Sequence, residues 1–403
     1  MSNNPLHLAV ALNGVGWHPA AWRSHGACPG ALFTPAYWAD LVAEAERGLL
    51  DFVTFEDAPG LQSAAPHRPD DRTDQVRGSL DALLLAAHLA PLTTHIGLVP
   101  TVNVTHTEPF HLAVGIATLD HASEGRAGWR PQISPRAADA AHFGRRSTPQ
   151  LTDDDIRDPE MIAKRLRPLF AEATDVVEVA RRLWDSWEDD AEIRDTATGR
   201  FIDRDKLHHI DFEGAYFNVK GPSITPRPPQ GQPLVASLAH ASTPYEFAAR
   251  GCDVVFITPF DRTGAKAILA RVDEAVDRVG RDVRASPLRR FADVVVFLDD
   301  EPGAAVRRKE RLDALDGTEF TSDAVIFTGS PGELADLLLD WRTTGLDGFR
   351  LRPGAVPHDL TAITRRLVPE LRQRGAFRTA YDTETLRGLL GLPRPRNRYA
   401  QED

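Results

Sequence analysis

Polar and aromatic side chains stand directly after several short apolar runs of the sequence. Glu56 and Asp57, for example, follow the run that begins at Asp51. At the carboxyl ends of parallel strands, such groups form a pocket with an apolar floor and a polar rim that binds a small organic molecule. The residues expected at this edge are Asn13, Trp17, His18, Trp22, Glu56, Asp57, Thr101, Asn103, Thr105, His106, Arg130, Gln132, Ser134, His240 and Ser242.

Within this set, Asn13, Trp17, His18, Trp22 and His106 are the residues predicted to contact a substrate. Structural roles compete with this interpretation. The two carboxylates after Asp51 suit a capping role in the next loop. Trp17 and Trp22 suit packing at the mouth of a barrel, and His106 suits an exposed loop.

A phosphate group is expected at the stretch AHASTPY, residues 239–245. This stretch leads into an expected helix, and the backbone amides at the start of a helix can bind an anion. Other chemistries lack their motifs: the sequence contains no HExxH, no GxSxG and no GxxxxGK[ST]. His208 and His209 have no further ligand at a suitable spacing. We therefore expect no metal site, and no residue is identified as a catalytic acid or base.

The elements that must position these groups alternate between short apolar runs and amphipathic stretches. The expected strands are 6–12, 51–56, 95–100, 125–129, 234–238, 254–258, 292–298 and 348–351. The expected helices are 35–49, 80–89, 109–119, 244–250, 265–279, 331–343 and 360–373. This alternation predicts a parallel sheet buried on both faces, closed as a (β/α)8 TIM barrel. An open doubly wound sheet is the alternative, although no GxGxxG follows the first strand.

The regular alternation is interrupted at residues 145–231. This stretch holds a long helical pattern at 159–187 and ends in the proline-rich GPSITPRPPQG of 221–231. We expect a single domain, 1–403, in which residues 145–231 form an insertion or lid over the site.

Composition narrows the class of protein. The 403 residues carry a net charge of −11, so neither nucleic acid nor an anionic membrane surface is an expected partner. Cys28 and Cys252 are the only two cysteines, which argues against a disulfide framework. The first residues lack the pattern of a signal peptide, and a cytoplasmic location is expected.

Several stretches resemble one group of the bacterial-luciferase-like flavin monooxygenases, the group of nitrilotriacetate monooxygenase, the pristinamycin synthase subunits and dibenzothiophene-sulfone monooxygenase. These stretches, which span nearly the whole chain in order, are LHLAVALNG (6–14), AAWR (20–23), DFVTFED (51–57), ATLDHASEGRAGW (117–129), HFG (142–144), LWDSWEDDA (183–191), GPSITPRPPQG (221–231), VPELRQRG (368–375) and LPRPRNRY (392–399).

The resemblance implies an enzyme that takes reduced FMN as a co-substrate from a separate NAD(P)H-dependent flavin reductase. Such an enzyme uses oxygen to oxygenate a small organic substrate, and the cofactor carries the oxygen chemistry. A homodimer is also implied. The identity of the substrate does not follow, because members of the group differ in the loops that contact it.

The family's cofactor contacts carry over unevenly. Asp57 and Ser134 match the pattern, and Asn103 replaces a small hydroxyl residue. Arg130 stands where asparagine is usual, and Phe170 where a phosphate-binding tyrosine is usual. The Gly-Ser-Ser phosphate turn reads Ala239, His240 and Ala241, with Ser242 one place late, and Leu166 replaces a histidine.

These departures leave two alternatives to the FMN enzyme. One is an oxidoreductase that uses another flavin, such as a deazaflavin. The other is a flavin-free homologue that acts as a binding protein, as a partner subunit or in different chemistry. Compensation is also possible, because Arg130 or His240 has donors that suit a phosphate.

Overall fold

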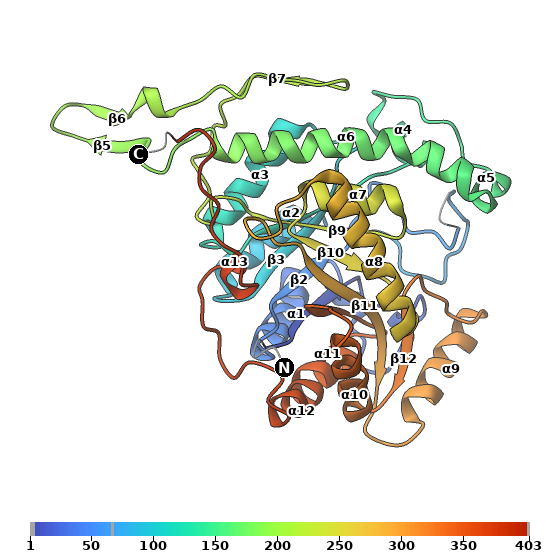
Figure 1. Ribbon diagram of the computed structural model, residues 1–403. Coiled ribbons are helices and arrows are strands. Elements are labelled where there is room, and N and C mark those ends of the chain that lie inside the picture. The colour runs from blue at the N-terminus through green and yellow to red at the C-terminus, as the bar shows by residue number, and fades with distance from the viewer. Residues whose placement is uncertain (1–4, 66–67, 401–403) are drawn as a thin grey trace.

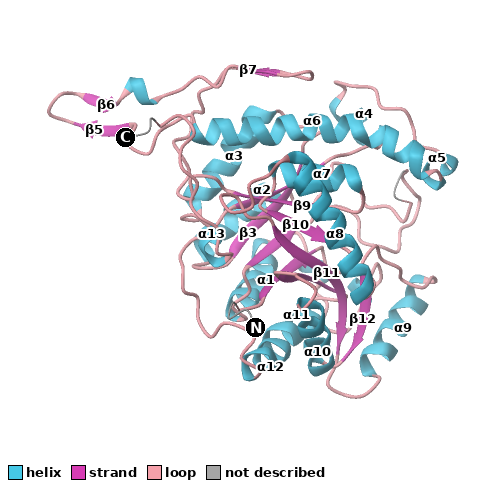
Figure 2. Ribbon diagram, in the orientation of Figure 1, coloured by secondary structure: helices cyan, strands magenta, loops and turns pink. Residues whose placement is uncertain are grey.

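The computed structural model describes residues 5–65 and 68–400 (Figure 1). Within this part of the chain, eight parallel strands form a closed barrel, and helices lie around it (Figure 2). The strands are β1 (His7–Leu12), β2 (Phe52–Phe55), β3 (Gly97–Asn103), β4 (Gly128–Gln132), β9 (Leu234–Leu238), β10 (Val254–Ile257), β11 (Arg289–Leu298) and β13 (Gly348–Pro353).

Strand pairing closes the barrel in chain order. Each strand is hydrogen-bonded to the next, β13 returns to β1, and β10 pairs with β11 through Val254↔Arg289. All of these pairings are parallel. The predicted (β/α)8 TIM barrel is therefore confirmed, and the open sheet is excluded.

The outer layer contains the expected helices. They are α1 (Pro35–Arg47), α2 (Ala82–Leu89), α3 (Pro109–Ala122), α6 (Pro159–Asp185), α7 (Ser242–Gly251), α8 (Arg262–Val279), α10 (Pro331–Arg342), α11 (His358–Ala362) and α12 (Val368–Gln373). Their starts follow from local chemistry, because α1 and α10 both carry proline in the first turn. At α10, Ser330 and Glu333 form a capping box. A π-helical turn, Ile363–Leu367, joins α11 to α12 where one continuous helix was expected.

Apolar packing outside and inside the ring of strands holds the barrel together. Residues that point outward from the strands, such as Val53 and Leu351, pack against the helices. The barrel interior is filled by Phe52, Phe256 and Phe291, whose ring centroids lie 5.7 to 6.2 Å apart. Leu386 of α13 (Leu386–Leu389) joins this inner cluster. The C-terminal segment thus packs against the interior of the barrel, and only the mouth at the other end remains for a site.

The segment 145–231 does not stand apart as one unit. Its long helix α6 packs between α3 and α7, so this helix belongs to the layer around the barrel. The rest includes α5 (Asp153–Arg157) and two hairpins that lie away from α10 and α12 in Figure 1. Those hairpins are β5 (Glu192–Asp195) with β6 (Arg200–Ile202), and β7 (Phe212–Glu213) with β8 (Asn218–Val219). The role of this segment as a lid stays a prediction.

Two elements between β11 and β13 were not expected from the sequence. Helix α9 (Ala304–Asp316) and strand β12 (Val325–Gly329) form an additional unit, and β12 pairs with the second half of β11. A shorter helix, α4 (Ala137–Phe143), follows β4 and was also missed. The α9–β12 unit matters for function because its connecting loop reaches the mouth of the barrel, as described below.

Long apolar helices of the kind that cross a bilayer are not found among the residues that the structure describes.

A buried ion cluster ties the C-terminal segment to the barrel. Asp253, just before β10, accepts hydrogen bonds from Arg181 of α6 at 2.9 Å and from Arg387 of α13 at 3.0 Å. Its other donor is the backbone amide of Val235 at 2.9 Å. Burial alone would raise the pKa of Asp253, but the two arginines outweigh it and lower that pKa.

We expect Asp253→Ala to lower the free energy of unfolding by about 3–5 kcal/mol, because the buried Arg387 and the half-buried Arg181 lose their shared counter-ion. Glu246→Ala is the matched control, since it breaks the exposed pair with Arg278 and should cost about 0–1 kcal/mol. Thermal and urea unfolding of the two variants provide the comparison. Equal losses would contradict the role given to Asp253.

Candidate active site

The carboxyl ends of the barrel strands hold a buried network of charges. Arg350 of β13 donates to Asp293 of β11 at 2.9 Å, and Arg352 donates to the same carboxylate at 2.9 Å. Both arginine side chains are 1% exposed and Asp293 is fully buried. Burial would raise the pKa of Asp293, but the two guanidinium groups reverse the effect and lower it.

The same network extends across the mouth to β2 and β4. Glu56 pairs with Arg130, and its other oxygen lies 3.4 Å from Arg350. Arg130 also donates from Nε to the hydroxyl of Thr101 at 2.9 Å. Arg352 reaches Asp323 at 2.6 Å, so three arginines meet three carboxylates. Arg130 is therefore committed to protein partners within a network whose charges balance.

A cavity of about 500 Å³ opens beside this network. Its floor includes Asn13 after β1 and Phe55 and Glu56 at the end of β2. Three stretches of the chain supply its walls: residues 13–33, residues 62–64 with 72–80, and residues 316–321. A volume of this size suits a small organic ligand. The third stretch belongs to the α9–β12 unit, so that unit completes the cavity.

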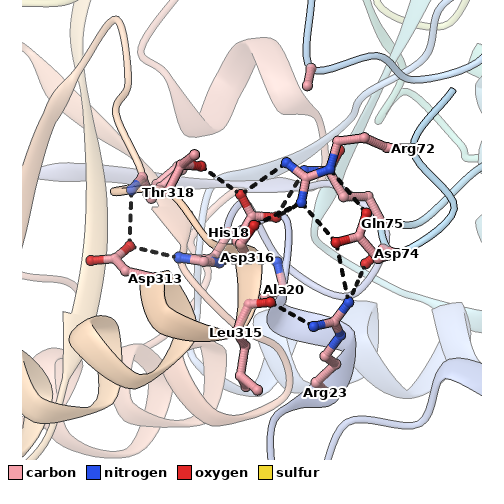
Figure 3. A network of polar contacts seen from close by, with 12 residues as sticks. His18, Ala20, Arg23, Arg72, Asp74, Gln75, Asp313, Leu315, Asp316 and Thr318 are labelled. Carbon is pink, nitrogen blue, oxygen red and sulfur yellow. Dashed lines mark hydrogen bonds and ion pairs between the residues drawn. The ribbon is translucent and has the colours of Figure 1, made fainter. Parts of the chain in front are cut away.

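Polar contacts fix the wall where these loops meet (Figure 3). Arg72 lies between Asp74 and Asp316, and its Nη2 is 2.8 Å from a carboxylate oxygen of each. His18 points toward Asp313 of α9, with 3.0 Å between Nε2 and Oδ1. Arg23 donates to the carbonyl of Leu315 at 2.6 Å. The end of α9 is thus bound to both of the other loops.

His18 is a neutral structural residue in this arrangement. Its Nδ1 accepts a hydrogen bond from the amide of Ala20 at 3.0 Å, so the proton sits on Nε2, which donates to Asp313. Burial lowers the pKa of His18, although Asp313 acts in the opposite direction. Because both ring nitrogens are engaged, His18 has no free nitrogen to accept a proton from a substrate.

The five residues predicted to contact a substrate do not all lie in the same cavity. Asn13, Trp17 and His18 line the main cavity. Trp22 lies outside its lining and donates from its indole to the carbonyl of Asp74 at 3.0 Å. His106 lines a separate, smaller cavity of about 120 Å³, where its ring stacks on Phe143.

Two of the predicted cofactor contacts are engaged in local structure. Asp57 accepts hydrogen bonds from the amides of Ala58 at 2.7 Å and Ala82 at 3.0 Å, which places it at the start of α2. Burial raises the pKa of Asp57 despite these bonds. The hydroxyl of Ser134 donates to Asp139 at 2.5 Å.

Unpartnered polar atoms gather at the ends of β3 and β4. Asn103 and Gln132 lie opposite each other on these strands. The side-chain nitrogen of Asn103 and the side-chain oxygen of Gln132 are both buried without a hydrogen bond. Nε2 of His106 is also buried without a hydrogen bond, although the backbone amide of His106 donates to the side-chain oxygen of Asn103. Buried polar groups without partners are rare and costly, so these atoms mark a place where a ligand can supply the missing bonds.

The start of α7 is the predicted phosphate position. Ala241 provides no side-chain cap, and the amides of the first turn have no partner within the helix. His240 is bonded through Nδ1 to Thr258 at 3.0 Å and faces Asp323 at 3.5 Å, while Ser242 is exposed. Phe170 of α6 packs against Phe247 of α7, with ring centroids 5.6 Å apart. The amides and the hydroxyl of Ser242 thus remain for an anion, whereas Phe170 contributes only apolar contact.

The residues that dominate the site were not predicted from the sequence. Arg350 and Asp293 sit inside strands that were expected to be apolar, and Arg352 lies just beyond the expected end of its strand. Asp316 is the last residue of α9, and Arg72 and Phe320 sit in loops. One signal was available for the strands: in GFRLRP the arginines alternate with Phe349 and Leu351, which face the outer core. Charged side chains at alternate positions must then point into the barrel.

Metal ligands are not grouped in the described residues, where no set of three or more histidine, cysteine, aspartate or glutamate side chains is arranged to hold an ion.

The sequence profile of the family described as luciferase-like monooxygenase matches residues 15–320. The chain belongs to this family. The luciferase-like monooxygenase is thus an oxygenating enzyme, and the family supports a flavin as its cofactor. The resemblance seen in the sequence is confirmed.

Full-length relatives agree with this assignment. N-acetyl-S-(2-succino)cysteine monooxygenase of Bacillus subtilis is 30% identical, and the match covers 98% of each chain. Nitrilotriacetate monooxygenase component A of Aminobacter aminovorans is 28% identical, with 99% of each chain covered. Among solved structures, EDTA monooxygenase from Chelativorans sp. BNC1 has a TM-score of 0.81 at 23% identity, covering 97% of this chain and 99% of that one. At that identity the structural likeness shows the fold alone.

We expect Arg130→Met to destabilise the luciferase-like monooxygenase by about 3–5 kcal/mol, because Glu56 loses a buried partner. Adding Glu56→Gln in the same chain should cost less than the sum of the two single changes, with a coupling of about 1–3 kcal/mol. A double-mutant cycle by urea unfolding measures this coupling. Additive losses would show that the pair does not act as a unit.

The luciferase-like monooxygenase should also lose stability as the pH falls below about 6.5. Because burial lowers the pKa of His18, the unfolded chain binds a proton that the folded chain does not, and stability rises with pH in that window. The melting temperature of wild type and His18→Gln, followed from pH 7.5 to 5, isolates this contribution. An unchanged slope in the variant would contradict it.

Proposed function

We propose that this luciferase-like monooxygenase uses reduced FMN, supplied by a separate NAD(P)H-dependent flavin reductase, and O₂ to oxygenate a small organic substrate. The observation that carries the proposal is the barrel-mouth cavity together with the unpartnered atoms of Asn103 and Gln132 at the ends of β3 and β4. Two relatives are named as parts of larger enzymes, one as a component of nitrilotriacetate monooxygenase and one as part of pristinamycin IIA synthase, which supports a separate reductase.

The residues present fit a flavin mononucleotide. Asn103 has a free donor and Gln132 a free acceptor, which suit the alternating polar groups on the edge of the isoalloxazine ring. The first turn of α7 and Ser242 would hold the phosphate, with His240 beside it. Arg130 would not contact the flavin directly, because its donors face Glu56 and Thr101. It would hold these two residues in place at the floor of the barrel mouth.

When bound, reduced FMN supplies the electrons that activate oxygen. The chain's own task is to exclude water and to orient the reactants, and Trp17, Trp38 and Phe55 give the cavity an apolar surface for this purpose. His18 keeps its proton on Nε2 and holds the wall through Asp313. We assign no acid or base among these residues. A homodimer in the cytoplasm remains part of the proposal.

A flavin-free homologue is the second candidate. It is favoured by Phe170, which has no hydroxyl for a phosphate, and by the commitment of Arg130 to Glu56. Anaerobic titration of the apo-protein with oxidised and with reduced FMN separates the two candidates, followed by flavin absorbance and fluorescence. Micromolar binding supports the monooxygenase. A lack of binding at hundreds of micromolar in both redox states would favour the flavin-free homologue.

We expect Asn103→Leu and Gln132→Leu each to weaken the binding of reduced FMN about three- to tenfold, because each removes a hydrogen-bonding group that the flavin would satisfy. Gln373→Leu makes the same chemical change on the exposed end of α12 and should leave binding unchanged. Equal affinity in all three variants would remove the ends of β3 and β4 from the flavin site.

A further inference from the structure

The charged groups that line the main cavity are satisfied by the protein itself. Arg72 is the only lysine or arginine among the described lining residues. Its Nε and one Nη bond to Asp74 at 2.9 and 2.8 Å, and both Nη atoms bond to Asp316 at 3.3 and 2.8 Å. The guanidinium is thus held between two carboxylates, as Figure 3 shows. An anionic ligand would find no free cation on the described part of this lining.

Negative charges on the lining are matched in the same way. Glu56 pairs with Arg130 and Arg350, and Asp316 pairs with Arg72. Glu319 is 82% exposed at the rim and lies 3.8 Å from Lys309. Among the lining residues that the structure describes, a cationic ligand would therefore find no buried carboxylate without a partner.

The remaining lining is largely aromatic and aliphatic. Trp38, Phe55 and Phe320 face the cavity with Trp17, whose ring already carries Arg352 at 4.5 Å on one face. Phe33 is 54% exposed at the entrance. Neutral hydrogen-bonding groups such as Asn13, Gln62 and Ser79 lie among them. This surface suits an apolar body that carries uncharged polar groups.

We propose that the substrate is an uncharged small molecule with a mainly apolar body, and that carboxylate-bearing compounds are excluded from the cavity. This rests on the proposed function, since it assigns the cavity to the oxygenated substrate. The physical reason is desolvation: a charged substrate would leave water and meet side chains whose charges are already paired. Nitrilotriacetate, the compound in the name of one relative, carries three carboxylates and would be excluded for the same reason.

Three probes of one shape test the proposal: 2-naphthamide, 2-naphthoate and 2-naphthylmethylammonium. Calorimetric titration into the full-length protein, with and without FMN, gives the affinity for each. We expect the amide to bind at least about tenfold more tightly than either ion. Equal or tighter binding of the carboxylate or of the ammonium ion would overturn the proposal, as would no binding of the amide at millimolar concentration.

A variant that removes a carboxylate partner of Arg72, called here a charge-release variant, makes the test independent of the probe's shape. Asp316→Asn removes one of the two carboxylates that hold Arg72, so the affinity for 2-naphthoate should rise about fivefold or more while that for the amide stays within about twofold. Asp74→Asn releases the same guanidinium through a residue outside the lining, and it serves if the first variant does not fold. Glu246→Gln is the control on an exposed pair.

Unchanged selectivity in both charge-release variants would show that pairing of Arg72 does not govern charge preference. FMN titration of the same preparations keeps the two proposals distinguishable. Normal flavin binding with preference for a charged probe would overturn the substrate class alone, whereas lost flavin binding with preference for the amide would overturn the flavin assignment alone.

Discussion

The structure depends on the pairing of buried charges inside a closed barrel. Asp293 is surrounded by Arg350 and Arg352, and the same network reaches Glu56 and Arg130 across the mouth. Ions in such a place are stable only when each has a partner of opposite sign in good geometry. The network therefore fixes four strands relative to one another, β2, β4, β11 and β13, beside the main cavity.

This arrangement also explains the chemical character of the site. Charges at the floor are paired with each other, and Arg72 on the wall is paired with its two aspartates. What remains exposed to a ligand is aromatic surface, neutral amides and the first turn of α7. A flavin ring and an uncharged substrate are both compatible with such surroundings, because neither needs a free countercharge, and the first turn of α7 offers amides to a phosphate.

Much of this was accessible from the sequence. Seven barrel strands were predicted from apolar runs, because a strand buried on both faces is largely apolar. The alternation of strands and helices required the fourth strand, which was expected at 125–129 and lies at Gly128–Gln132. Helix α9 was missed because it buries only Ala305, Arg308 and Leu312, which leaves no continuous apolar stripe. The apolar run at the start of β12, Val325 to Phe327, was overlooked. The partners of Arg130 could not be predicted either, since they come from β2 and β3, far away in the chain.

The position of α13 has a consequence for how the protein is made. Leu386 and Leu390 lie in the inner cluster with Phe52 of β2, and Asn397 binds the carbonyls of Asp185 and Trp187 at 2.8 Å. Leu386 and Leu390 thus complete an inner cluster that also holds Ala9 of β1. During synthesis, the apolar interior of the barrel stays open to water until these residues leave the ribosome. A nascent chain therefore completes the packing of the barrel interior only after Leu386, Leu390 and Leu392 have emerged, and chaperones have that interval in which to bind it.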